Sequence, residues 1–130
     1  MIVYLSRAQI LHLHRLQTAR FGGSVRLRDK RALESAVARP QATFGGEDLY
    51  PDVPAKAAAL MHSLVMNHPF ADGNKRVGAH AAILFLKANH FQPGFASQEL
   101  AEVTLAVARG EVSAEALTIW IRQRTREREG

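Results

Sequence analysis

The amino-acid sequence predicts an all-α fold, a bundle of about six helices around a central buried helix. Two observations lead to this prediction: apolar residues recur at helical spacing along most of the chain, and the alternating pattern of β-strands is nearly absent. Apolar residues make up 47% of the 130 residues, enough for one packed core. We therefore expect a single domain over residues 1–130, with a basic tail from about residue 122.

End signals place the first two helices. After a short extended start, Ser6 can cap a helix that runs to about residue 20, and Gly22-Gly23 stops it. A second helix begins near Asp29 and ends before Pro40, because a residue that precedes proline disfavours the helical region. The residues of the first helix that we expect to face inward are Ile10, Leu13 and Leu16.

Two longer helices are predicted in the middle of the chain, after a loop between Pro40 and Pro51. The third helix covers about residues 53–67 and carries one apolar stripe. The fourth begins near residue 73 or 74 and runs to about residue 89. Its middle is apolar on nearly all sides, so we expect it to run through the centre of the bundle and to hold its own N-terminus rigidly.

Two shorter helices and a basic tail complete the chain. Ser97 and Ser113 are expected N-caps, Gly110 ends the first of these helices, and Trp120 anchors the second against the core. No aromatic residues for base stacking lie between the arginines of the tail, which favours a solvated, fraying helix end over a nucleic-acid arm. These arginines are Arg122, Arg124, Arg126 and Arg128.

The composition excludes several classes of protein. The chain has no cysteine, which removes disulfides, thiolate catalysis and cysteine-based zinc sites. No apolar run approaches the roughly 18 to 20 residues of a membrane span, and the first residues lack a basic leader. We expect a soluble, cytoplasmic protein with no membrane partner, and much of its net charge of +5 is terminal.

Residues 68–76 read His-Pro-Phe-Ala-Asp-Gly-Asn-Lys-Arg and collect the groups that bind phosphate. The start of a helix offers unpaired backbone N–H groups and the positive end of the helix dipole. Gly73 lets the backbone approach a ligand closely, because it has no Cβ. Asn74 can add a neutral donor, while Lys75 and Arg76 can balance the charge of a polyphosphate.

The same stretch holds a candidate base and a candidate metal ligand. His68 can accept a proton at neutral pH, since an unperturbed imidazole titrates near pH 6.5. Asp72 offers the oxygen ligands that suit Mg²⁺. A zinc site on one helix is the main rival, but Pro69 and Gly73 break the helical geometry that would bring His68 and Asp72 together. Phe70 is expected to be an apolar plug beneath the loop.

At these residues the chain resembles the Fic/Doc family. Residues 33–40, Leu-Glu-Ser-Ala-Val-Ala-Arg-Pro, and residues 44–51, Phe-Gly-Gly-Glu-Asp-Leu-Tyr-Pro, look like its death-on-curing (Doc) toxin branch. The resemblance covers roughly residues 20–92. It implies an all-α Fic fold in which His68 activates a target hydroxyl, Asp72 holds Mg²⁺, and Gly73, Asn74, Lys75 and Arg76 cradle the phosphates of ATP.

The resemblance also implies that the loop between Pro40 and Pro51 is a flap that aligns a protein target by strand-like pairing. Without the family resemblance, an inert connector would be the preferred interpretation. The residues expected to form the target-binding flap are Phe44, Gly45, Gly46, Glu47, Asp48 and Leu49.

Lys75 bears on which part of ATP is transferred. Family members that attach AMP usually have glycine at this position, whereas Doc-like members have lysine and are thought to present the γ-phosphate. The chain has 13 arginines and four lysines, so lysine is not its usual cation. Gly73 and Val77 depart from the Doc pattern, which leaves AMP transfer open as the alternative.

The resulting hypothesis is the toxin of a toxin–antitoxin system, a kinase that phosphorylates a Ser or Thr of a cytoplasmic protein such as translation elongation factor Tu. It implies ATP and Mg²⁺ as cofactors and a cognate antitoxin, encoded by an adjacent gene, as partner, with nucleic acid contacted only through the antitoxin. Adenylyl transfer by the same residues is one alternative. The other is a catalytically silent helical module that binds an antitoxin or nucleic acid.

His80 and residues 125–130 can each be interpreted in two ways. His80, four residues after Arg76, can approach the nucleotide or can be a hydrogen-bonded core histidine, and we favour the second. Residues 125–130, Thr-Arg-Glu-Arg-Glu-Gly, match the sequence pattern of an inhibitory motif of some Fic enzymes. Glu and Arg are abundant in this tail, which favours a coincidence.

Overall fold

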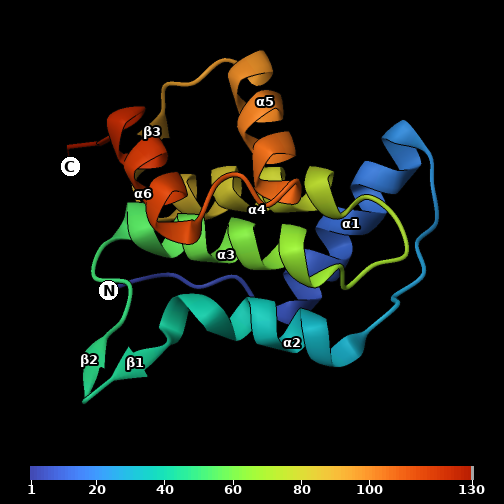
Figure 1. Ribbon diagram of the computed structural model, residues 1–130, viewed down its shortest axis with the longest axis horizontal. Helices are drawn as coiled ribbons and strands as arrows, with labels where there is room; N and C mark the ends of the chain where they lie inside the picture. The colour runs from blue at the N-terminus through green and yellow to red at the C-terminus, as the bar shows by residue number, and fades with distance from the viewer. Residues whose placement is uncertain (130) are drawn as a thin grey trace.

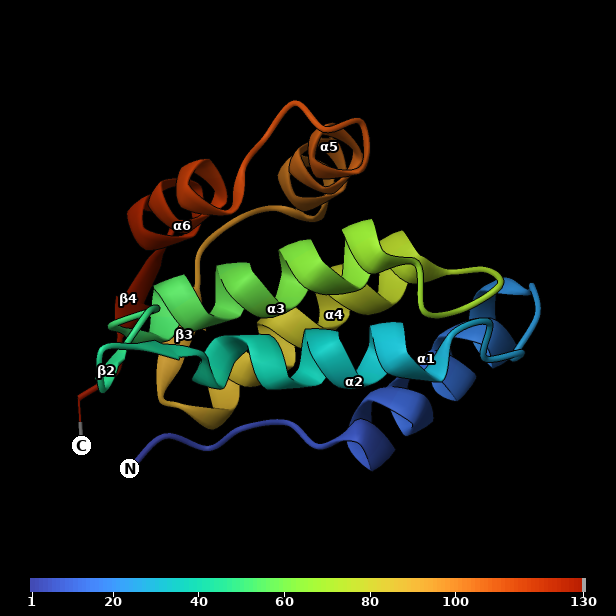
Figure 2. The ribbon, with the colours of Figure 1, turned by 60° about the horizontal axis from the view of Figure 1, so that its bottom comes forward.

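The computed structural model describes residues 1–129 and confirms a predominantly helical fold (Figure 1). Figure 2 shows α5 and α6 on one side of the α3–α4 pair, with α1 and α2 on the other. The helices of the described chain are α1 (Arg7–Phe21), α2 (Lys30–Ala38), α3 (Val53–Asn67), α4 (Asn74–Ala88), α5 (Ser97–Ala108) and α6 (Ala114–Gln123), with a 3₁₀ turn, η1 (Arg39–Gln41), after α2.

The centre of the bundle is α3, which corrects the expectation that the helix after the motif would lie there. Every residue from Val53 to Leu60 is buried, including a run of alanines that lets neighbouring helices approach closely. By contrast, the longest continuously buried run in α4 covers residues 77–79. The two helices meet at Gly78, where an added Cβ would lie 2.8 Å from a methyl group of Val65.

The helix ends follow local capping rules, with one correction. Ser6 caps α1 in a reciprocal capping box with Gln9, and Ser113 caps α6. Ser97 is not a cap but the first residue of α5, whose N-cap is Ala96. The carboxylate of Glu99 accepts the Ala96 N–H instead, and this hydrogen bond, helped by Arg124, lowers the pKa of Glu99.

The inward face of α1 also differs from the prediction. Ile10 is fully buried, but Leu16 is 53% exposed, and His14 is buried in its place. At 100° per residue, Leu16 points about 120° away from Ile10, whereas His14 points within about 40° of it. The helical period therefore places His14, and not Leu16, on the inward face of α1. The prediction for Leu16 was wrong because it rested on the apolar character of the residue.

A short hairpin follows η1. It consists of β1 (Thr43–Phe44) and β2 (Glu47–Asp48), paired antiparallel around two glycines with positive φ angles, 60° at Gly45 and 83° at Gly46. The hairpin is tied to the core by Lys56, whose side chain is 1% exposed. Its Nζ lies 3.1 Å from the Asp48 carboxylate and donates to the carbonyl of Pro40 at 3.3 Å.

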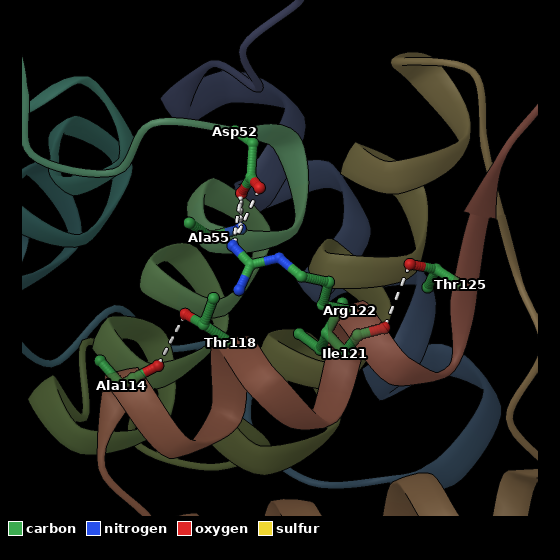
Figure 3. A network of polar contacts seen from close by, with 7 residues as sticks. All are labelled: Asp52, Ala55, Ala114, Thr118, Ile121, Arg122 and Thr125. Atoms are coloured by element: carbon green, nitrogen blue, oxygen red, sulfur yellow. Dashed lines mark hydrogen bonds and ion pairs between the residues drawn. The ribbon is translucent and has the colours of Figure 1, made fainter.

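The basic tail is not a fraying helix end. Residues of β4 (Thr125–Glu127) pair antiparallel with β3 (Phe91–Pro93), so this part of the tail is a strand. Arg122 belongs to α6 and makes a two-pronged contact with Asp52, at 2.9 and 3.0 Å (Figure 3). Trp120 is half-buried and packs against Phe95, as expected of an anchor. The interpretation of residues 125–130 as an inhibitory motif includes Gly130, which lies outside the described residues.

Within residues 1–129, no helix combines the length and the apolar character needed to cross a membrane.

Candidate active site

The motif forms the loop between α3 and α4, and its two ends have left-handed backbone conformations. His68 ends α3 with φ 50° and ψ 56°, and Gly73 precedes α4 with φ 80° and ψ 17°. The side chain of Arg28 covers the end of α3, since its Nε donates to the carbonyl of His68 at 2.7 Å and a terminal nitrogen donates to that of Asn67 at 3.1 Å. These bonds satisfy carbonyl groups that a helix end leaves unpaired. The His68 side chain remains exposed.

An extended segment, residues 26–29, lies against the motif. The Arg28 N–H donates to the carbonyl of Pro69 at 2.8 Å, and the Ala71 N–H donates to that of Arg26 at 3.0 Å. Between these bonds, Leu27 faces Phe70 in an antiparallel bridge. In this arrangement the polar backbone groups of Leu27 point away from Phe70. They have no partner among the described residues, so the outer edge of the segment is open.

Asn74 closes the loop from within. Its Oδ1 accepts the N–H of Phe70 and its Nδ2 donates to the carbonyl of Phe70, each at 3.0 Å. The side chain that we expected to donate to phosphate is therefore engaged in holding the loop. Phe70 is 1% exposed, in agreement with the predicted plug. The second hydrogen on Nδ2 and the backbone N–H of Asn74 are what this residue can still offer a phosphate.

The first turn of α4 is open to an anion. No acceptor in the described chain pairs with the backbone N–H groups of residues 73–76, and Gly73 contributes no capping side chain. A left-handed residue followed by a helical turn brings successive N–H groups to one side, where they favour a negatively charged ligand. Lys75 is exposed, and the Arg76 guanidinium lies 5.0 Å from the centre of the Phe21 ring.

These groups border a cavity of about 470 Å³ between α4 and α5. The structure thus gathers the predicted metal ligand, Asp72, and the predicted phosphate-binding residues, Gly73, Asn74, Lys75 and Arg76, at one end of the cavity. His68 is exposed and is not part of its lining. The rest of the lining comes from Ala79, His80 and Ile83 of α4 and from Ser97, Leu100, Ala101, Thr104 and Leu105 of α5.

Asp72 offers a single carboxylate, so it suits a metal ion that takes its remaining ligands from phosphate and water. The carboxylate lies directly over Gly23, so close that a Cβ at residue 23 would collide with it. Within residues 1–129, no group of three or more His, Asp or Glu side chains could hold an ion. Mg²⁺ fits such a single carboxylate, because it commonly takes one or two carboxylates together with phosphate oxygens and water.

The residues of the predicted flap are not brought to the motif. The hairpin lies at the opposite end of α3 from the α3–α4 loop (Figures 1 and 2). A helix of 15 residues is about 22 Å long, so this is the order of the separation. Phe44 is 82% exposed and Leu49 is 46% exposed, and neither lines the cavity beside the motif.

A sequence model of the Fic/DOC family matches residues 4–86, which is more than half of the chain and includes the whole motif. The chain belongs to the Fic/DOC family. It is 47% identical over 92 residues to the Toxin Doc of Mycolicibacterium smegmatis, covering 71% of this chain and 68% of that protein. It is 31% identical over 120 residues to the Protein kinase doc of Escherichia phage P1, covering 92% of this chain and 94% of that protein.

Three residues around this Fic/DOC motif escaped the sequence interpretation. His14 contacts the motif from α1, Arg28 covers the end of α3, and Gly23 makes room for Asp72. One signal for His14 is present in the sequence, since a histidine four residues after Ile10 falls on the inward face of α1 and needs a polar partner there.

In this Fic/DOC chain, His80 is a hydrogen-bonded histidine and also borders the cavity in which a nucleotide would lie. Its Nδ1 lies 3.0 Å from the carbonyl of Arg76, one turn earlier on α4, and the residue is half-buried, as favoured for a hydrogen-bonded histidine. It also lines the cavity. Because a carbonyl can only accept, Nδ1 carries the proton and Nε2 of the neutral ring is an acceptor. A contact between this nitrogen and a nucleotide stays a prediction.

Proposed function

We propose that this protein is the toxin of a toxin–antitoxin pair and transfers the γ-phosphate of ATP to a Ser or Thr hydroxyl of a cytoplasmic protein, such as translation elongation factor Tu. The observation that carries the proposal is the open first turn of α4, with Asp72, Lys75 and Arg76 around one cavity. The relative named Protein kinase doc covers 92% of the chain, and the name Toxin Doc supports a cognate antitoxin as partner.

The candidate site residues of the motif have separate roles in this proposed reaction. His68 accepts the proton of the target hydroxyl, whose oxygen then bonds to the γ-phosphorus while the bond to the bridging oxygen breaks and ADP leaves. The N–H groups of residues 73–76, together with Lys75 and Arg76, stabilise the charge of the transferred group. Asp72 would hold Mg²⁺, which supplies charge neutralisation to the phosphates.

Two segments are candidates for the protein substrate. A target paired with the 43–48 hairpin would need to span about 20 Å to His68, roughly six extended residues. A target paired with the open edge of residues 26–29 would lie directly beside the motif, because this segment bonds to Pro69 and Ala71. We therefore place the target at residues 26–29 in the proposal, with the hairpin as the alternative docking segment.

Labelled ATP tests the function. The purified protein, Mg²⁺ and a cell extract are incubated with ATP labelled on the γ- or the α-phosphate. We expect protein labelling from the γ-position and none after His68→Ala. Labelling from the α-position alone would show adenylyl transfer, the alternative for the same site. If the folded protein gives no labelling from either position, the catalytically silent binding module becomes the favoured interpretation.

A further inference from the structure

We propose that His14 is a positioning residue that orients the phosphate-binding backbone of the motif from α1, an inference that rests on the proposed function. His14 is 1% exposed and lies on α1, 58 positions before Asp72 in the sequence. Its partners are three residues of the motif itself: Phe70, Asp72 and Gly73.

The first contact is polar and sets the direction of one peptide group. His14 Nε2 lies 2.7 Å from the carbonyl oxygen of Asp72, and since a carbonyl can only accept, Nε2 carries the proton and donates. In a planar trans peptide the C=O and the following N–H point in opposite directions. The Gly73 N–H therefore points away from His14. It has no partner among the described residues, and Gly73 borders the cavity.

The other two contacts fix the ring itself. The imidazole stacks on Phe70 with the ring centres 3.7 Å apart and the planes within 7° of parallel. A Cβ added to Gly73 would lie 3.3 Å from His14 Nε2, so the ring fills the space beside this glycine. Phe70 is in turn held by both ends of the Asn74 amide. The ring can thus neither turn nor withdraw without moving the loop.

The consequence is that the direction of the Gly73 N–H, at the start of the phosphate-binding turn, is set from α1 before a ligand arrives. Preorganised donors are effective because they need no rearrangement during the reaction. His14 touches no reacting atom and acts only through the backbone of Asp72 and Gly73.

Three variants separate this role from a merely structural one. His14→Phe keeps an aromatic ring against Phe70 but removes the donor. His14→Gln loses the ring but places an amide N–H near the position of Nε2. Ile10→Ala is the matched control, because Ile10 is fully buried one turn earlier on α1 and makes no contact that orients the Asp72 carbonyl.

We expect His14→Phe to lower the transfer of γ-phosphate about tenfold to a hundredfold per folded molecule, the range found when groups that orient a ligand are removed. His14→Gln should recover most of the rate, and Ile10→Ala should lower the urea midpoint while leaving the rate per folded molecule near that of the wild type. A His14→Phe rate equal to the wild type, or an equal loss in Ile10→Ala, would overturn the inference.

Pyrophosphate binding distinguishes a failure of this inference from a failure of the proposed function. If the wild type transfers no phosphate, the proposed function is contradicted. Calorimetric titration can then still compare the affinity of the wild type for pyrophosphate with that of His14→Phe. Weaker binding by His14→Phe would support the positioning role. Equal binding, or none by either protein, would refute it.

Discussion

At the scale of single residues, Lys75 is the residue on which the proposal of γ-phosphate transfer rests. It is exposed at the start of α4 and borders the cavity, so its ammonium group is free to meet a phosphate. We expect Lys75→Met to lower γ-phosphate labelling about a hundredfold, the effect of removing one donor from a site of developing charge. Lys75→Arg should restore only part of the rate, because a guanidinium differs from an ammonium in shape and hydration.

The control for this substitution lies on the same helix. Lys87 is also exposed and follows Lys75 by 12 positions, or about 18 Å along α4. Lys87→Met removes the same charge from the protein without approaching the motif, and labelling should be unchanged. Equal losses in the two variants would mean that net charge, rather than the position of Lys75, governs the reaction.

Single residues also show how far the site could be predicted. The motif is continuous in sequence, so its residue types could be matched to phosphate chemistry directly. Their neighbours could not be identified in this way, because the contacts of His14 and Arg28 with the motif join residues 58 and 40 positions apart. Asn74 shows a second limit. An amide suits a phosphate or a loop carbonyl equally well, and only the fold decides between them.

At the scale of elements, the open edge of residues 26–29 makes a sharp prediction about substrate docking. Leu27→Pro removes an N–H that no described residue uses, and Leu27→Ala removes the same side chain while keeping that N–H. If a target segment pairs with this edge, the KM for the protein target should be higher in Leu27→Pro than in Leu27→Ala. Steady-state labelling with a purified target measures the difference.

The hairpin offers the matched comparison. Phe44 and Glu47 flank the two-residue turn, and the Leu49 N–H donates to the carbonyl of Ala42, so the N–H of Thr43 points outward. Thr43→Pro therefore alters the outer edge of the hairpin without breaking its ladder, and Thr43→Ala is its control. A higher KM for Thr43→Pro, with no effect of Leu27→Pro, would return the docking role to the hairpin.

The elements differ in how well the sequence predicts them. The bounds of α3 agree with the prediction at both ends, because Asp52 caps its start and the motif ends it through local signals. The pairing of β3 with β4 was missed because these strands have three residues each and are joined only across 30 or more positions. The central place of α3 was also missed, since the pattern of one helix does not say how many neighbours will cover it.

At the scale of the whole molecule, α4 connects the candidate site with the end of the bundle where the N-terminus and the β3–β4 pair lie (Figure 2). An asparagine stands at each end of this helix. Asn74 bonds both ways to the backbone of Phe70. Asn89 accepts from the Val3 N–H at 2.7 Å and donates to the carbonyls of Val3 and Phe85, each at 2.9 Å.

The two asparagines should therefore separate stability from function. Each alanine substitution leaves backbone groups unpaired, so we expect each to lower the free energy of unfolding by about 2 kcal/mol, measured by urea denaturation. Asn89→Ala should keep the wild-type labelling rate per folded molecule, because the contacts that it breaks lie at the opposite end of α4 from the motif. Asn74→Ala should lower that rate about tenfold or more, because the loop that presents Asp72 and Gly73 loses its clamp. Equal labelling by two equally destabilised variants would show that the motif loop keeps its shape without Asn74.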